Sequence, residues 1–168
     1  MQESISGGIS GAITDPYSEE AEAHAELYYE EIRHFRTDIN KIAENTGFTP
    51  EQIMLVKNYL FVDEHLLDGE IKRFDPSFEI AESWQRLAFD PKNIQQHDMT
   101  LLYHELMEME LIHQGYQQSE AHEITSKDYN YPKESREYYE ELGYDEKQNG
   151  SSKNSGGIKT KKNWAERC

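Results

Sequence analysis

Residues 97–122, HDMTLLYHELMEMELIHQGYQQSEAH, decide the fold, because they predict a long helix, a glycine turn and a second helix. At 100° per residue, His97, His104 and Glu108 fall on one stripe of the first helix. Glu105 lies beside this stripe, whose other members are apolar. A buried polar group without a partner costs roughly 1 to 3 kcal/mol. The stretch therefore predicts polar side chains in the core that satisfy one another or bind a metal.

Prolines indicate where the other helices begin. Four of the five prolines follow Asp or Thr, which suits the start of a helix. Thr49 is also followed by Gln52 in a capping-box pattern. The expected helices cover about 17–36, 38–45, 50–63, 76–88, 98–114, 120–128 and 132–142.

No stretch of the sequence has a convincing two-residue alternation of β-branched side chains, so strands are not required. Asp68-Gly69 is expected to form a turn. The predicted fold class is all-α, a compact orthogonal bundle of about six to seven short helices. We expect a disordered segment at 1–14, a single helical domain at 15–143 and a disordered basic tail at 144–168.

The charge distribution separates the domain from its tail. The chain of 168 residues has a net charge of −16, and residues 1–144 hold 11 basic and 30 acidic side chains, a net of −19. Binding a phosphate backbone depends on Lys and Arg, so the charge of the domain disfavours nucleic acid as a partner. Metals, cationic ligands and basic protein surfaces fit the acidic domain better.

Cysteine use and hydropathy also limit the function classes. The single cysteine, Cys168, allows no disulfide within the chain. No apolar run approaches the 18 or so residues that span a bilayer, and the first residues lack the features of a signal peptide. We therefore expect a protein that is neither exported by a signal peptide nor inserted in a membrane.

The sequence H-E-L-M-E at 104–108 resembles the H-E-x-x-H pattern of zinc hydrolases. His104 and Glu108 can both point at one metal ion, and Glu105 can activate its bound water as the catalytic base. The third ligand would be His122 or His97, and the ion would be zinc or another divalent metal. The alternative is structural: His104 and Glu108 form a hydrogen-bonded pair that orders a buried helix junction, with His122 and Asp98 as further partners.

A series of short motifs resembles the C-terminal region of phage minor head (head-morphogenesis) proteins of Gram-positive bacteria. They are ISGAITDPYSEEAEAHAELYYEEIRHFRTDINKIAENTGF, VKNYLF, RFDP, IAESWQRL, residues 97–122 and YNYP, in that order. Related modules are similar to the C-terminal tips of polymorphic toxins. The resemblance covers about residues 5–142, and its most characteristic motif matches Asp98, Leu101, Leu102, His104, Glu105, Glu108, Ala121, His122 and Tyr129.

The resemblance implies a phage-derived helical module that acts through protein–protein contacts, in the virion head or as a prophage remnant. Its partner would be a phage structural or immunity-type protein, and its location the bacterial cytoplasm or the virion. The alternative is a toxin-like, metal-dependent hydrolase with the H-E-x-x-E site. In the structural interpretation, a polar cluster joins His97, Asp98, His104, Glu108, His122 and Tyr129.

Overall fold

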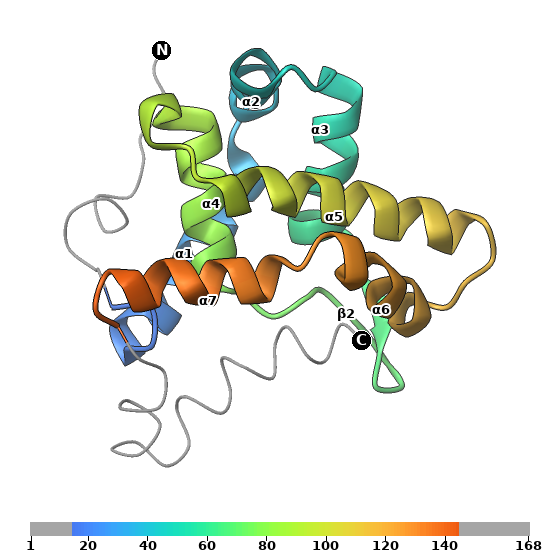
Figure 1. Cartoon of the computed structure of the whole chain (residues 1–168). Coiled ribbons are helices and arrows are strands. Elements are labelled where there is room, and N and C mark those ends of the chain that lie inside the picture. Colours follow the sequence, from blue (N-terminus) through green and yellow to red (C-terminus); the bar gives the residue numbers. More distant parts are fainter. Residues whose placement is uncertain (1–14, 145–168) are drawn as a thin grey trace.

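The computed structural model describes residues 15–144, which form an all-α fold with one short β-hairpin (Figure 1). The expectations for 1–14, for the basic tail after Tyr144 and for Cys168 lie outside the described residues. The elements are α1 (Glu19–His34), α2 (Asp38–Thr46), α3 (Pro50–Lys57), the π-helical turn η2 (Asn58–Val62), β1 (His65–Leu67), β2 (Glu70–Lys72), α4 (Phe78–Phe89), the 3-10 turn η3 (Pro91–Asn93), α5 (Gln96–His113), α6 (Gln118–Asp128) and α7 (Tyr131–Glu141).

Side-chain caps set the helix starts. Ser18 and Ser77 accept hydrogen bonds from backbone N–H groups in the first turns of α1 and α4, so both helices begin after the Asp-Pro pairs proposed as their starts. The capping box of Thr49 and Gln52 at α3 is confirmed. The central helix was expected to start near Asp98 and begins two residues earlier, at Gln96. Asp98 is the third residue of α5, and its carboxylate accepts the Gln95 N–H at 2.8 Å.

The β-hairpin was not expected as sheet structure, although the turn at Asp68-Gly69 was. Its strands have three residues each and pair antiparallel, Leu66 opposite Ile71. Asp68 and Gly69 have φ angles of 49° and 82°, the left-handed conformation that a two-residue hairpin turn requires. Strands this short have no room for a recognisable alternation.

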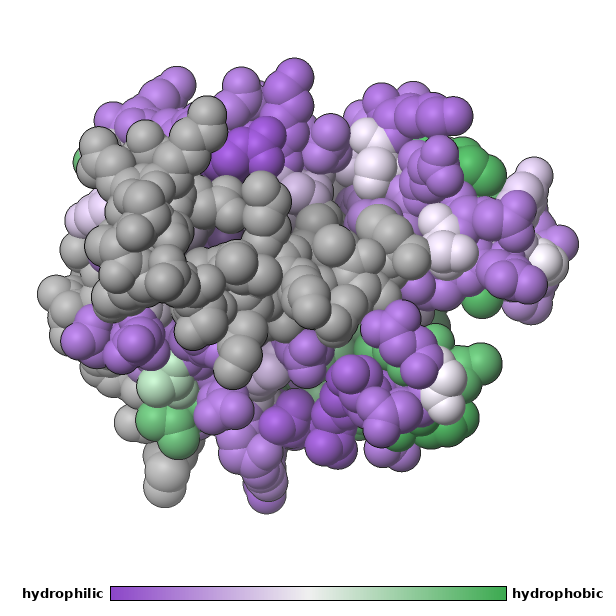
Figure 2. All heavy atoms as spheres, turned by 90° about the horizontal axis from the view of Figure 1, so that it is seen from below, coloured by the Kyte–Doolittle hydropathy of each residue, from purple (hydrophilic) through white to green (hydrophobic). Residues whose placement is uncertain are grey.

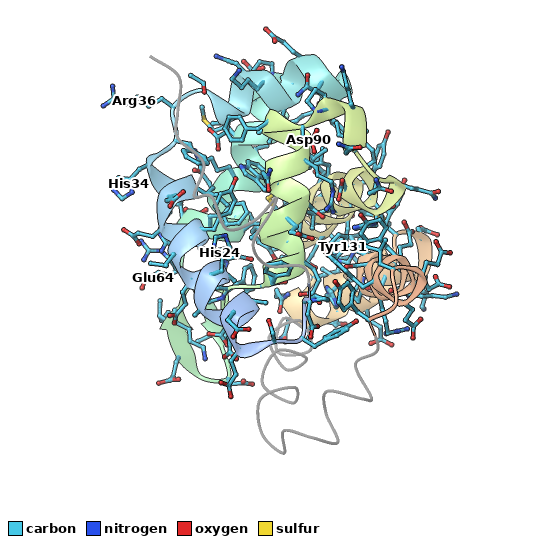
Figure 3. All side chains as sticks on the ribbon, turned by 90° about the vertical axis from the view of Figure 1, so that its left-hand side faces the viewer. His24, His34, Arg36, Glu64, Asp90 and Tyr131 are labelled. Atoms are coloured by element: carbon cyan, nitrogen blue, oxygen red, sulfur yellow. The ribbon has the colours of Figure 1, made fainter. Side chains whose placement is uncertain are left out.

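The core surrounds α4, which α5 and α7 cross nearly at right angles in the view of Figure 1. Trp84, Leu87 and Ala81 on α4 are buried with the aromatic side chains of α1. Figure 3 shows Tyr131 in the interior, whereas His34 and Arg36 point away from the body of the protein. The crossing helices bring α5 and α7 against one face of α4.

A buried ion pair joins three helices. Asp38 on α2 accepts hydrogen bonds from Lys57 Nζ on α3 and Trp84 Nε1 on α4, each at 3.0 Å. Burial raises the pKa of Asp38, and the charge of Lys57 opposes that rise. None of the helices within 15–144 combines the length and the apolar character needed to cross a bilayer.

Candidate metal centre

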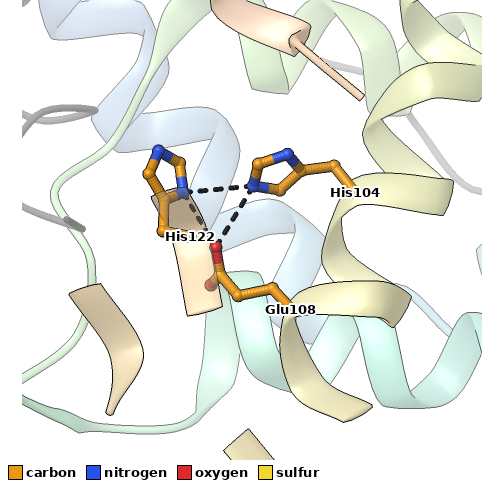
Figure 4. Close-up of side chains that lie close together, drawn as sticks. All are labelled: His104, Glu108 and His122. Carbon is orange, nitrogen blue, oxygen red and sulfur yellow. Dashed lines mark hydrogen bonds and ion pairs between the residues drawn. The ribbon is translucent and has the colours of Figure 1, made fainter. Parts of the chain in front are cut away.

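Three side chains from two helices meet at one point in the core (Figure 4). His104 and Glu108 lie one turn apart on α5, and His122 comes from α6. His104 Nε2 lies 3.1 Å from both Glu108 Oε1 and His122 Nδ1, and His122 Nδ1 lies 2.8 Å from Glu108 Oε1. His104 and Glu108 are 0% exposed and His122 is 3% exposed. We call these three residues the His–Glu–His centre.

A chain reversal after α5 brings His122 to the centre. Gly115 follows the helix with a φ of 111°, which side-chain-bearing residues rarely adopt. The N–H groups of Gly115 and Tyr116 donate to the carbonyls of Ile112 and Leu111 and so close the end of α5. The chain then turns back, and α6 packs its buried face against α5 with His122 facing His104.

The tautomer of His104 follows from its hydrogen bonds. His104 Nδ1 lies 2.8 Å from the backbone carbonyl of Tyr129, which can only accept. His104 Nδ1 therefore carries the proton, and in the neutral ring Nε2 presents its lone pair to the centre. A backbone acceptor on the far nitrogen is the usual arrangement around a metal-binding histidine, because it fixes the ring and its tautomer.

The two oxygens of Glu108 have separate surroundings. Oε1 faces the two histidines, whereas Oε2 accepts hydrogen bonds from the Tyr59 hydroxyl and, at 3.4 Å, from Gln118 Nε2. Tyr59 lies on the π-helical turn η2, a rare conformation that often occurs at functional sites. One oxygen is thus held by neighbouring side chains, and the other is directed to the centre.

The spacing of the three ligand atoms fits a small divalent cation. Ligands 2.0 to 2.1 Å from a tetrahedral zinc ion lie about 3.3 to 3.4 Å from one another. The atoms of the His–Glu–His centre are 2.8 to 3.1 Å apart, so movements of a few tenths of an ångström would admit the ion. Within residues 15–144 this is the only group of three His, Cys, Asp or Glu whose ligand atoms gather within 4.8 Å.

Glu105 and Tyr129 were also predicted at the site, but their side chains are not among the three that meet there. Glu105 follows His104 on α5 and is fully buried, but it does not belong to the group of clustered ligand atoms. Tyr129 contributes its backbone carbonyl to His104, whereas its ring stacks on Tyr103 at 5.4 Å between ring centroids. The tyrosine side chain is therefore not part of the centre.

The expected convergence of His97 and Asp98 with the centre is wrong. Asp98 binds Arg86 of α4 through two hydrogen bonds of 2.8 Å, and His97 Nε2 lies 3.1 Å from the same guanidinium. His97 precedes His104 by seven residues, about 10 Å along a helix. The predicted stripe on α5 is buried as expected, but its residues belong to two clusters. His97 lies beside Arg86, whereas His104 and Glu108 belong to the His–Glu–His centre. His97 is also too far along α5 to be the third ligand.

The cluster around Arg86 lies between α4, α5 and α7. Burial raises the pKa of Glu82, which accepts a hydrogen bond from the Tyr139 hydroxyl and lies 3.5 Å from the Arg86 guanidinium. Burial lowers the pKa of His97 to about 4, and the positive charge of Arg86 acts in the same direction. This cluster therefore keeps His97 neutral and joins three helices.

Sequence reasoning missed two residues of the site, Tyr59 and Gln118. Tyr59 lies in the helix expected over 50–63, but nothing in the sequence indicates that its hydroxyl meets a glutamate 49 positions later. Gln118 lies four residues before His122, and this spacing was a usable signal, because it places both on one face of α6.

Comparisons with models of known families, with curated proteins and with solved structures found no match to this chain.

Proposed function

We propose that this protein is a metal-dependent hydrolase whose His–Glu–His centre binds one zinc-type divalent cation. The observation that carries the proposal is the mutual approach of three buried ligand atoms, one from each side chain, from α5 and α6. Two histidines and a glutamate are a ligand set found in zinc hydrolases. Here Glu108 stands where the H-E-x-x-H pattern has its second histidine, and the second histidine of the centre, His122, comes from α6.

The donors and acceptors at the centre also support a cation. His104 Nε2 and Glu108 Oε1 both present lone pairs when the histidine is neutral and the carboxylate ionised. His122 Nδ1 lies within 3.1 Å of both atoms. A divalent ion can accept lone pairs from all three atoms at once.

We assign Glu105 the role of general base. It is next to ligand His104 on α5, and a glutamate at this position serves as the base in H-E-x-x-H enzymes. The ion would lower the pKa of a water molecule so that it can act as a nucleophile near neutral pH. In hydrolysis of an amide, the water oxygen bonds to the carbonyl carbon and the C–N bond breaks. Glu105 would accept a proton from the water and give it to the departing amine.

The charge of the chain favours some substrates over others. A net charge of −19 over residues 1–144 repels phosphate backbones. Peptides and small uncharged or cationic molecules avoid this repulsion. Because the three ligands are buried, substrate would reach them only after a covering element moves.

The metal site is tested by metal analysis of the purified protein and by zinc titration after chelator treatment. We expect one zinc per chain. Glu108→Gln and His122→Ala should lose it, whereas Glu110→Gln and His113→Ala, exposed positions on the same helix as Glu108, should retain it. Absence of stoichiometric binding in the parent protein, or equal binding by all four variants, would refute the proposed centre.

The hydrolase role is tested with Glu105→Gln in the zinc-loaded protein. This variant should keep its zinc and lose hydrolysis of a mixed peptide library followed by mass spectrometry. Glu110→Gln is the matched control and should cleave like the parent protein. A zinc-loaded parent protein without hydrolysis, or an active Glu105→Gln variant, would leave the metal site in place but refute the assigned chemistry.

We propose as a second candidate a phage-derived module that acts through protein–protein contacts in a virion or as a prophage remnant. Two apolar side chains on the hairpin support it, because Leu66 and Ile71 are 68% and 67% exposed. The two candidates differ in their response to one change. A contact module would keep its biological effect in Glu105→Gln, and a hydrolase would lose it.

A further inference from the structure

The β-hairpin contacts the His–Glu–His centre indirectly, through Tyr59. His65 on β1 has its Nε2 2.8 Å from the backbone carbonyl of Tyr59, the residue whose hydroxyl binds Glu108. His65 also stacks on Phe74, with ring centroids 4.2 Å apart. Leu67 packs into the same cluster as Tyr59 and Phe74. The hairpin therefore packs against the tyrosine that holds Oε2 of Glu108.

The other face of the hairpin is apolar and exposed. Leu66 and Ile71 are cross-strand partners, so their side chains lie on the same face, opposite to buried Leu67. Their exposures of 68% and 67% exceed those of the other exposed large hydrophobic residues of the described chain. Figure 2, viewed from the side on which the hairpin projects in Figure 1, shows a mostly hydrophilic surface with apolar side chains gathered at its lower right.

Acidic side chains lie before, between and at the tip of the two strands that carry this apolar pair. Asp63, Glu64, Asp68 and Glu70 are all exposed, and Figure 3 shows Glu64 on the outside of the molecule. The hairpin also carries two cations: Lys72, half-buried on β2, and Arg73, which donates through Nε to the Val62 carbonyl and interacts with Glu30 of α1. The tip of the hairpin thus presents an apolar surface in a negative field.

The sheet also has edges that can accept another strand. It contains two strands, so within residues 15–144 each strand has a strand neighbour on one side only. An extended peptide can add to such an edge through backbone hydrogen bonds, while alternate side chains contact one face of the sheet. The exposed pair Leu66 and Ile71 provides that contact surface.

We infer that the hairpin binds an extended peptide in which apolar residues alternate with Lys or Arg, as the substrate of the proposed hydrolase. The apolar side chains would cover Leu66 and Ile71, and the cations would face the acidic residues of the tip. This inference rests on the proposed function for its catalytic meaning, but peptide binding can be measured without catalysis. An anionic lipid surface is disfavoured because the acidic tip would repel it.

The test uses the full chain and a fluorescent nine-residue peptide of alternating Lys and Val, measured by anisotropy at low salt with a chelator present. We expect saturable binding. A Leu66→Ser/Ile71→Ser double variant should raise the Kd about tenfold or more. Leu27→Ser, at a comparably exposed apolar position on α1 (63%), should leave the Kd unchanged.

Two peptide controls test the chemistry of recognition. A peptide of alternating Glu and Val should not bind, because the tip is acidic. The Lys–Val peptide with N-methyl groups on alternate residues should bind weakly, because it cannot form the strand hydrogen bonds. Equal binding of the Glu–Val peptide, or equal loss in Leu27→Ser and in the hairpin variant, would overturn the inference.

The outcome is separable from that of the proposed function. Glu108→Gln should lose zinc and still bind the Lys–Val peptide, whereas the hairpin variant should keep its zinc and lose the peptide. Zinc retention also shows that the hairpin variant is folded. Peptide binding that fails while zinc binding and hydrolysis persist refutes the hairpin inference alone.

Discussion

His104 connects two helices and a backbone segment through its two ring nitrogens. Nδ1 binds the carbonyl of Tyr129, and Nε2 faces Glu108 and His122. Removing such a buried partner leaves the others with unmet hydrogen bonds. The two clusters on α5 therefore contain the residues at which single substitutions should have the largest consequences.

His104→Ala should lower the free energy of unfolding by about 1 to 3 kcal/mol or more, because Tyr129 and Glu108 lose a buried partner. Urea denaturation at pH 7.5 measures the change. His113→Ala on the same helix is exposed and should change stability by less than about 0.5 kcal/mol. Equal effects of the two substitutions would show that the buried hydrogen bonds of His104 do not contribute to stability.

His97 should make stability depend on pH. Its folded-state pKa is lowered to about 4 by burial, below the value of about 6.5 in an unfolded chain. Between these values the unfolded chain binds the proton and the folded protein does not, so stability falls as the pH falls. Relative to His97→Asn, the parent protein should lose about 2 kcal/mol between pH 7.5 and pH 5.

The comparison with His97→Asn cancels the titration of other groups, including the carboxyls of Asp38 and Glu82. Urea denaturation of both proteins at the two pH values gives the difference. A difference that stays constant with pH would mean that His97 is protonated equally well in the folded and unfolded states.

At the scale of elements, the reversal between α5 and α6 determines whether the centre forms. His122 reaches His104 only because the chain turns back at Gly115. No atom outside the adjacent residues lies within 4 Å of a Cβ placed at Gly115, so the constraint is the backbone angle alone. A substitution at Gly115 can therefore disturb the centre without touching any of its three side chains.

Gly115→Ala should cost about 1 to 2 kcal/mol, since a left-handed residue with a Cβ is strained. If the strain shifts α6, zinc affinity should fall as well, measured by competition with a fluorescent chelator. Gly143→Ala is the matched control, because Gly143 has a φ of 97° at the end of α7. It should lose similar stability and keep its zinc affinity. Equal zinc affinities in both variants would show that α6 is held by packing alone.

The elements that the sequence predicted best were those with a strong helical period. Ile80, Trp84 and Leu87 recur at helical spacing in the sequence and are buried on α4, and the stripe on α5 placed His104 and Glu108 together in the core. Helix starts and the hairpin were less predictable, because serine caps competed with Asp-Pro pairs and three-residue strands have no visible period. The role of Tyr59 depends on a contact 49 residues away, which no local pattern contains.

At the scale of the whole fold, three buried polar clusters connect helices within residues 15–144. They are the Asp38–Lys57–Trp84 group, the cluster around Arg86 and the His–Glu–His centre. The first two contain their own cations, Lys57 and Arg86. The third includes two acceptor atoms and no permanent cation among its three side chains. A bound divalent ion would give the third cluster a cation as well.

Zinc should therefore stabilise the whole fold. An ion that binds only the folded state at one hundred times its Kd adds about 2.7 kcal/mol. Thermal unfolding should show a higher Tm with zinc, a return to the lower Tm with chelator, and no zinc-dependent shift in Glu108→Gln. An unchanged Tm of the parent protein in excess zinc would contradict the proposed centre.

The π-helical turn Asn58–Val62 bears on how related sequences should be compared. Such a turn contains roughly one residue more than a turn of α-helix. Deleting a residue there would rotate one side of the helix by about 100° relative to the other. Tyr59 would then no longer be aligned with both the hairpin and Glu108. The length of this helix, and not only the identity of its tyrosine, should accordingly distinguish sequences that keep the centre from those that have lost it.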